Sequence, residues 1–248
     1  MTEIESNTPQ SNIAQPDAPT QRRLPVIAID GPAGAGKSTL AAHLARRFGL
    51  LNLESGAMYR ALALKAIESD IGFEDEAALS ALFATTTIEL QPQSEGNRVL
   101  LDGHDVTRRV RERDVAEGAS QVSVHPQVRQ WMVAQQRALG ANGGVVMEGR
   151  DIGTKVFPDA EVKIFLDAAP EVRGQRRFLQ GGPVPPTVTE ESVLVALRER
   201  DARDRSRAAS PLEPAPDAIL LDSTGMTFEE VTARSEEIVR QRLALAGL

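Results

Sequence analysis

The sequence predicts a doubly wound α/β fold, in which helices cover both faces of a parallel sheet. Four short apolar runs recur along the chain, at residues 26–29, 145–147, 162–166 and 218–221, and helical patterns separate them. Strands that alternate with helices in this way are typical of the fold class. The first run leads into a glycine-rich segment, which indicates a buried parallel strand that turns directly into a helix.

Two further segments interrupt this alternation. Residues 85–106 contain strand-like runs around Ser-Glu-Gly-Asn and Asp-Gly turn signals, which predicts a small antiparallel hairpin. Residues 180–189 are rich in Gly and Pro and precede a helical segment. We expect a mobile loop there, with Thr187 and Glu190 spaced as a capping box at the start of the helix.

Composition separates a tail from a folded domain. The chain has 248 residues, and at roughly 150 residues per domain it holds one large domain or two small ones. Its 41% hydrophobic and 25% charged residues are typical of a globular protein. Residues 1–24 differ, because they are rich in Ser, Thr, Gln, Asn and Pro and have too little apolar surface to offset the entropy of ordering. We expect a disordered tail over 1–24 and one folded domain over 25–248.

Missing residue types exclude several kinds of site. The chain has no cysteine, which rules out disulfides, thiolate metal sites and cysteine nucleophiles. His43, His104 and His125 are far apart, which argues against a histidine metal site and a Ser-His-Asp hydrolase. No apolar run approaches the ~18 residues that a membrane-spanning helix needs, and the net charge of −7 disfavours bulk nucleic-acid binding. We expect a soluble, cytoplasmic monomer with no membrane or nucleic-acid partner.

A phosphate-binding motif follows the first predicted strand. Residues 31–38, Gly-Pro-Ala-Gly-Ala-Gly-Lys-Ser, match the pattern G-x-x-x-x-G-K-[ST]. Backbone N–H groups of such a loop point at the β-phosphate of a nucleotide, while Lys37 reaches the β- and γ-phosphates and the Ser38 hydroxyl ligates Mg²⁺. The chain is therefore predicted to bind a nucleoside triphosphate. The residues assigned to this site are Gly31, Pro32, Ala33, Gly34, Ala35, Gly36, Lys37, Ser38 and Thr39.

Three classes of protein share this motif. A regulatory GTPase needs an Asn-Lys-x-Asp segment to bind its base, and no asparagine here is followed by lysine. The segment Asp222-Ser-Thr-Gly225 fits Asp-x-x-Gly but lies too far from the loop for a switch element. A motor or transport ATPase would show a strand that ends in an acid followed by Glu, together with a signature loop, and neither is evident. A small-molecule kinase is favoured, because arginines supply the second site that an anionic acceptor needs.

Candidates for the acceptor site begin at the second predicted helix. Ser55 and Arg60 lie near its start, where the alternatives are a plain N-cap and a solvated charge. Glu148, Arg150 and Asp151 come just after a strand, at the edge where doubly wound sheets bind their ligands.

Two arginine clusters flank the Gly/Pro-rich segment. Arg173, Arg176 and Arg177 precede it, and a helical face with i, i+3, i+4, i+7 spacing follows it. An exposed helix with surface ion pairs is the alternative interpretation. Guanidinium groups next to a flexible loop favour a helical lid over residues 172–207 that closes over phosphates. The residues on that face are Arg200, Arg203, Asp204 and Arg207.

The matching segments are specific enough to indicate a family. They include IDGPAGAGKST, ESGAMYRALAL, LLDGHDVT, ASQVSVHPQVR, VVMEGRDIGTKVFPDAEVKIFLDA, RERDARDRSR and ILLDST, in this order over residues 25–248. In these segments the chain resembles the bacterial cytidylate kinases, which are the (d)CMP kinases of the nucleoside monophosphate kinase superfamily. Only the tail lies outside the resemblance.

The resemblance implies a P-loop kinase fold and the transfer of the γ-phosphoryl of ATP to CMP or dCMP with Mg²⁺, with an acceptor-binding insert over 56–118. It assigns catalysis to Lys37, Arg150, Asp151 and Arg207, and the lid contacts with the ATP phosphates to Arg173, Arg176 and Arg177. It assigns the acceptor phosphate to Ser55, Arg60, Arg150 and Arg207, the cytosine to Ser120, Arg129 and Asp151, and the pentose to Arg200 and Asp204.

Two positions depart from the family pattern. Glu54 and Glu148 stand where the family often has Asp, so their contacts with Mg²⁺ or water are not carried over. Two alternatives stay open: a kinase for another small acceptor, such as UMP, AMP or shikimate, and a nucleotide-dependent binding module whose insert docks a partner.

Overall fold

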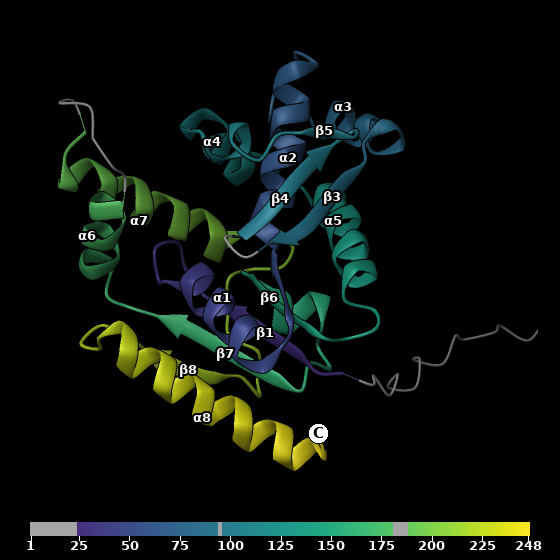
Figure 1. Cartoon of the computed structure of the whole chain (residues 1–248). Coiled ribbons are helices and arrows are strands. Elements are labelled where there is room, and N and C mark those ends of the chain that lie inside the picture. The colour runs from purple at the N-terminus through teal and green to yellow at the C-terminus, as the bar shows by residue number, and fades with distance from the viewer. Residues whose placement is uncertain (1–23, 94–95, 181–187) are drawn as a thin grey trace, which may run out of the picture.

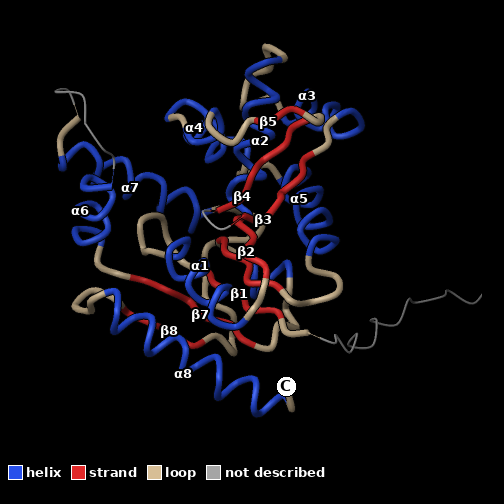
Figure 2. Tube along the Cα trace, in the orientation of Figure 1, coloured by secondary structure: helices blue, strands red, loops and turns tan. Residues whose placement is uncertain are grey.

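A five-stranded parallel sheet forms the centre of the structure (Figure 1, Figure 2). This computed structural model describes residues 24–93, 96–180 and 188–248. The strands of the sheet are β1 (Val26–Asp30), β2 (Leu51–Glu54), β6 (Val145–Gly149), β7 (Val162–Asp167) and β8 (Ile219–Asp222). They lie in the order β2-β6-β1-β7-β8, and all neighbours pair in parallel. The helices on its two faces include α1 (Lys37–Phe48), α2 (Ser55–Glu68), α5 (Pro126–Leu139) and α8 (Phe228–Ala246).

The central strand β1 alternates its side chains between two cores. Ile27 and Ile29 pack with apolar residues of α1 and α8 on one face of the sheet. Val26 and Ala28 pack on the other face with residues of α2 and α5. All four side chains are fully buried, which explains why the run carries no polar residue. The predicted doubly wound α/β fold is confirmed.

A small antiparallel sheet extends the structure on the α2 side (Figure 1). Leu90, Val99 and Leu101 of this sheet join the same core as α2 and α5. The antiparallel hairpin predicted within residues 85–106 is confirmed. The sheet consists of β3 (Ile88–Gln93), β4 (Gly96–Leu101) and β5 (His104–Asp105). The neighbouring helical elements are α3 (Glu76–Ala81), η1 (Leu82–Thr85), η2 (Arg109–Arg111) and α4 (Arg113–Val122).

Two helices, α6 (Pro170–Gln180) and α7 (Glu190–Ser206), pack side by side beside the sheet (Figure 1). A capping box starts α7, but it is not the predicted pair. The Thr189 hydroxyl accepts from the Ser192 N–H at 3.1 Å, and the Ser192 hydroxyl accepts from the Thr189 N–H at 3.0 Å. The predicted cap, Thr187, lies outside the described residues.

Other expectations have mixed outcomes. Strand β2 was not predicted, because its Leu51-Asn-Leu-Glu sequence is short, polar at alternate positions and at the sheet edge. The predicted disordered tail and Gly/Pro-rich loop fall largely outside the described residues. The functional division into an insert over 56–118 and a lid over 172–207 stays a prediction. None of the helices in the described part of the chain is long and apolar enough to cross a membrane.

Candidate active site

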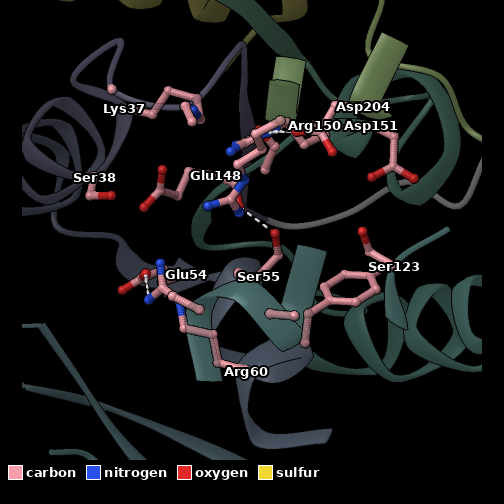
Figure 3. Close-up of a pocket in the computed structure, with 18 of the residues that line it drawn as sticks. Lys37, Ser38, Glu54, Ser55, Arg60, Ser123, Glu148, Arg150, Asp151 and Asp204 are labelled. Atoms are coloured by element: carbon pink, nitrogen blue, oxygen red, sulfur yellow. Dashed lines mark hydrogen bonds and ion pairs between the residues drawn. The ribbon is translucent and has the colours of Figure 1, made fainter. Parts of the chain in front are cut away.

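One pocket lies at the carboxyl edge of the parallel sheet, between α1, α2, α5 and α7 (Figure 3). Lys37, Ser38 and Glu148 gather at one end of it, and Asp151 and Asp204 at the other. Most of the predicted site residues line this pocket. They are Ala33, Gly34, Gly36, Lys37, Ser38, Thr39, Ser55, Arg60, Arg129, Arg150, Asp151, Arg176, Arg177, Arg200, Asp204 and Arg207.

The glycine-rich loop passes close to strand β7. A Cβ atom on Gly31 would lie 1.9 Å from the Leu166 carbonyl oxygen, and Gly31 has a φ of 147°, so only glycine fits there. Gly31, Pro32 and Ala35 form the back of the loop and do not line the pocket. The loop then opens helix α1, whose first N–H groups lack helical partners and suit an anion.

Lys37 curls back over this loop. Its Nζ donates to the Pro32 carbonyl oxygen at 2.7 Å, and the side chain is buried. Burial, together with the nearby Arg150 guanidinium, lowers the pKa of Lys37 to about 7. A bound polyphosphate would reverse this shift, because an anion next to an amine favours its charged form.

Two carboxylates, Glu148 and Glu54, line the pocket at the same end as Ser38. Burial and the neighbouring Glu54 raise the pKa of Glu148, while Lys37 and Ser38 oppose the rise. Glu54 accepts a hydrogen bond from Nη1 of Arg60 at 2.8 Å. Like charges held this close are relieved by a cation, so this donor set of a hydroxyl and two carboxylates fits Mg²⁺.

Ser55 does not cap α2, so the structure does not support the alternative of a plain N-cap. Its hydroxyl donates to the Glu148 carbonyl oxygen at 2.6 Å, and it therefore ties the start of α2 to the end of β6. Asn97 of the insert supports the same junction: its side chain accepts from the Glu54 N–H at 2.8 Å and donates to the Asn52 carbonyl oxygen at 2.7 Å. The antiparallel sheet is therefore bonded directly to the edge of the pocket.

Three arginines surround Asp204 on α7. Nε of Arg150 donates to Asp204 at 3.0 Å, and Nη1 of Arg207 lies 3.3 Å from its other oxygen. Although burial opposes it, these arginines hold the pKa of Asp204 below its ordinary value. Burial and the charge of Arg150 lower the pKa of Arg200 to about 10. One carboxylate thus serves several guanidinium groups, which leaves positive charge available for an anion.

A second ion pair closes the far end. Nη2 of Arg129 donates to Oδ2 of Asp151 at 2.5 Å. The Arg129 guanidinium also lies 5.5 Å from the centre of the Tyr59 ring. The Tyr59 hydroxyl is buried and has no hydrogen-bond partner among the described residues, and burial raises its pKa to about 12. Arg207 also approaches Ser123, whose hydroxyl lies 3.4 Å from its Nη1.

Two further predicted residues, Arg173 and Ser120, lie outside the pocket. Arg173 is buried under the loop, where it donates to the carbonyl oxygens of Ala168 at 2.8 Å and Ala33 at 3.0 Å and pairs with Asp201 at 2.6 Å. The structure thus places Arg173 behind the phosphate-binding loop. The Ser120 hydroxyl is also buried, 3.4 Å from the Arg203 guanidinium.

Other lining residues escaped the sequence analysis as site residues. Tyr59 follows Ser55 by four positions and Ser123 follows Ser120 by three, so helical spacing could have placed each on the right face. Glu54 was noted only as a departure from a pattern. Ala119 and Leu197 carry no chemical signal that sequence could have used.

A parallel sheet, a phosphate-binding loop that opens a helix, and an arginine-rich second half of the same pocket define a P-loop kinase. The family model for cytidylate kinase matches residues 27–241. The chain belongs to the cytidylate kinase family.

Relatives that bear this name cover nearly the whole chain. The cytidylate kinase of Aeromonas salmonicida is 47% identical over 90% of this chain and 97% of that protein. The cytidylate kinase of Pelotomaculum thermopropionicum is 50% identical over 84% of this chain and 92% of its own length. The cytidylate kinase of Geobacillus thermodenitrificans is 47% identical over 90% of this chain and 99% of that protein.

Proposed function

We propose that this protein transfers the γ-phosphoryl group of ATP to CMP or dCMP and releases ADP and CDP or dCDP. The observation that carries the proposal is a single pocket that joins a phosphate-binding loop to a cluster of arginines and acids, in a chain of the cytidylate kinase family. Such transfer needs no covalent enzyme intermediate, because positioning and charge stabilisation supply the catalysis.

The donor end holds ATP. Backbone N–H groups at the start of α1 face the β-phosphate, and Lys37 leaves the Pro32 carbonyl oxygen to contact the transferring group. Arg176 and Arg177 line the pocket from α6 and face the same phosphates. Arg173 keeps the loop in place from behind through the Ala33 carbonyl oxygen.

The acceptor end holds the monophosphate. Arg60, Arg150 and Arg207 supply guanidinium groups for its phosphate, and Arg200 and Asp204 lie where the pentose would follow. Arg150 and Arg207 also stabilise the charge that moves between the two nucleotides. The lid formed by α6 and α7 closes over both substrates.

The base is read by Arg129 and Asp151, with Ser120 close behind. The Asp151 carboxylate accepts from the exocyclic amine of cytosine, whereas uracil presents an oxygen at that position and is repelled. The Arg129 guanidinium donates to the ring oxygen that both pyrimidines share. This arrangement favours CMP over UMP, AMP or shikimate as the acceptor.

Mg²⁺ would be held by the Ser38 hydroxyl and by Glu148 and Glu54, directly or through water. The described residues contain no cluster of three or more acidic or histidine side chains suited to a metal, which agrees with an ion whose other ligands are phosphate oxygens and water. The ion would neutralise charge on the β- and γ-phosphates. We further propose that the enzyme works as a cytoplasmic monomer.

Coupled detection of ADP against a panel of CMP, dCMP, UMP, AMP and shikimate tests the proposal. We expect ADP release with CMP and dCMP, and Lys37→Ala should lower turnover by about two orders of magnitude or more. Lys65→Ala is the control, since Lys65 pairs with Asp102 away from the pocket. Equal turnover with AMP or shikimate would refute the acceptor assignment, and a Lys37→Ala enzyme within about threefold of wild type would refute the role of the loop.

A further inference from the structure

Asp30, the last residue of β1, bonds to the segment that directly follows the pocket residue Asp151. Its Oδ1 accepts from the Ile152 N–H at 2.8 Å, and its Oδ2 accepts from the Gly153 N–H at 2.7 Å. The carboxylate is buried. Asp30 directly precedes Gly31, so the same residue begins the phosphate-binding loop and reaches the segment that follows Asp151.

The two amides need this partner. They begin a π-helix, η3 (Ile152–Val156), and the first N–H groups of a helix have no partner within it. The side chain of the residue before a helix usually accepts from them, but that residue is Asp151, which makes no such bond. Asp151 instead pairs with Arg129.

Asp30 is therefore a cap supplied by a neighbouring strand. Because Asp30 accepts from the first N–H groups of η3, the Asp151 side chain does not have to cap the helix and can face the pocket. The Asp151 carbonyl oxygen is fixed by the same helix, since it accepts from the Lys155 N–H at 2.8 Å. The backbone of Asp30 pairs with Gly149 on one side and Phe165 on the other, so the cap rests on the middle of the sheet.

We propose that Asp30 is a positioning residue that holds the Arg150–Asp151 segment against the start of the phosphate-binding loop and thereby sets recognition of the acceptor's pyrimidine base. This inference rests on the proposed acceptor. Arg150 and Asp151 make ion pairs with different helices, α7 and α5. A small shift of the segment would therefore disturb the acceptor phosphate and the base together, while the loop keeps its bonds with the Lys37 and Arg173 side chains.

Burial of a charged cap is costly, which argues that the bidentate geometry matters. Burial, and to a lesser degree the charge of Asp151, raises the pKa of Asp30 to about 6. A neutral asparagine would avoid that cost and has nearly the same shape. It offers only one acceptor oxygen, so one of the two amides would face an NH₂ group.

Asp30→Asn is the main test. We expect hydrogen exchange of the ligand-free protein to speed up at the amides of Ile152 and Gly153. We also expect kcat/KM for CMP to fall about tenfold or more, and the CMP-to-UMP ratio to fall with it, while the KM for ATP stays within about threefold. Retention of the wild-type CMP-to-UMP ratio would overturn the proposal.

Gly153→Ala approaches the same bond from the other side. Its added methyl group would lie 3.3 Å from Oδ2 of Asp30 and 3.2 Å from Cδ of Lys163, so it should push the amide away without removing a charge. We expect the same direction of change in the CMP-to-UMP ratio. An unchanged ratio in this variant would also count against the positioning role.

Val239→Ala is the matched control for simple destabilisation. Val239 is fully buried in α8, in the core on the far side of the sheet. The Val239→Ala variant should have a lower melting temperature and an unchanged CMP-to-UMP ratio. If Asp30→Asn and Val239→Ala both weaken CMP and ATP binding to the same extent, Asp30 has only a structural role. If the wild-type enzyme itself does not prefer CMP, the acceptor assignment fails, whereas the exchange of Ile152 and Gly153 still reports on the cap.

Discussion

Arg129 and Asp151 form an ion pair at 2.5 Å with side chains only 3% and 5% exposed. Arg129 uses one carboxylate oxygen, Oδ2, and among the described residues none donates to Oδ1. The pair therefore orients the carboxylate and leaves its second oxygen for a ligand. The same two side chains therefore stabilise the pocket through their ion pair and are available to bind the base.

Asp151→Asn should weaken discrimination between the pyrimidines. The amide can place a donor where the amine of cytosine also donates, and it removes the repulsion against uracil. We expect the CMP-to-UMP ratio of kcat/KM to fall about tenfold or more, because a buried polar group left unpaired costs about 1–3 kcal/mol. Steady-state kinetics with both nucleotides measures the ratio.

The control for this variant is Asp217→Asn. Asp217 also pairs with a cation, Lys163 at 2.9 Å, but it does not line the pocket. Equal slowing of CMP and UMP by Asp151→Asn would show that Asp151 organises Arg129 or Arg150 and does not read the base.

Arg207→Ala should impair the transfer itself. Arg207 is buried next to Asp204 and lines the pocket, so its loss removes positive charge near the acceptor phosphate. We expect kcat/KM for CMP to fall about a hundredfold. Arg205→Ala is the matched control at the same helix end, because Arg205 is half-exposed and lies 3.7 Å from Asp167 outside the pocket. Similar losses in both variants would contradict a specific role for Arg207.

Arg173→Ala and Arg177→Ala should separate stability from ATP binding. Arg173 is buried against Asp201, and removal of one partner of such a pair costs about 3 kcal/mol or more. Arg177 lines the pocket, so its removal should raise the KM for ATP about tenfold and change stability by less than about 0.5 kcal/mol. Urea unfolding and ATP titration measure both quantities. If the Arg173→Ala protein is as stable as wild type but binds ATP more weakly, Arg173 contacts the ATP phosphates and is not mainly structural.

Asp30 predicts a pH-dependent term in stability. Its pKa is raised to about 6, so between about pH 4 and 6 the folded state binds more protons than the unfolded state. The free energy of unfolding should therefore fall as pH rises through this window. Relative to Asp30→Asn, wild type should lose on the order of 2–3 kcal/mol between pH 4 and 7. Urea unfolding of both proteins at several pH values checks this, and a constant difference would show that Asp30 ionises normally.

Much of the architecture was predictable because its signals are local. The apolar runs at residues 26–29 and 145–147 are continuous and fully buried, so the strands β1 and β6 that they predict lie at the centre of the sheet. The four-residue edge strand β2 has no such signal, because within the described residues it pairs with one strand only, β6, and its side chains are only partly buried.

The site was harder to predict than the fold. The spacing of residues along the sequence shows which of them share a helix face, but not what that face packs against. Arg173 and Arg177 are both on α6, and one is buried under the loop while the other faces the pocket. The bond from Ser55 to the Glu148 carbonyl oxygen joins residues from different elements, so no local cue could distinguish it from a helix cap. The role of Asp30 also has no local cue, since both of its amide partners lie beyond residue 150.

The strand order has a consequence for how the chain is made. Within the described residues, β1 pairs only with β6 and β7, which begin at Val145 and Val162. Synthesis proceeds from the N-terminus, and a domain generally folds as a unit. On a ribosome, the apolar run of β1 must therefore wait without a partner strand until most of the chain has been translated, and the elements between β2 and β6 can form their mainly local contacts in the meantime. The nucleotide-binding loop is translated early but becomes functional only late in folding.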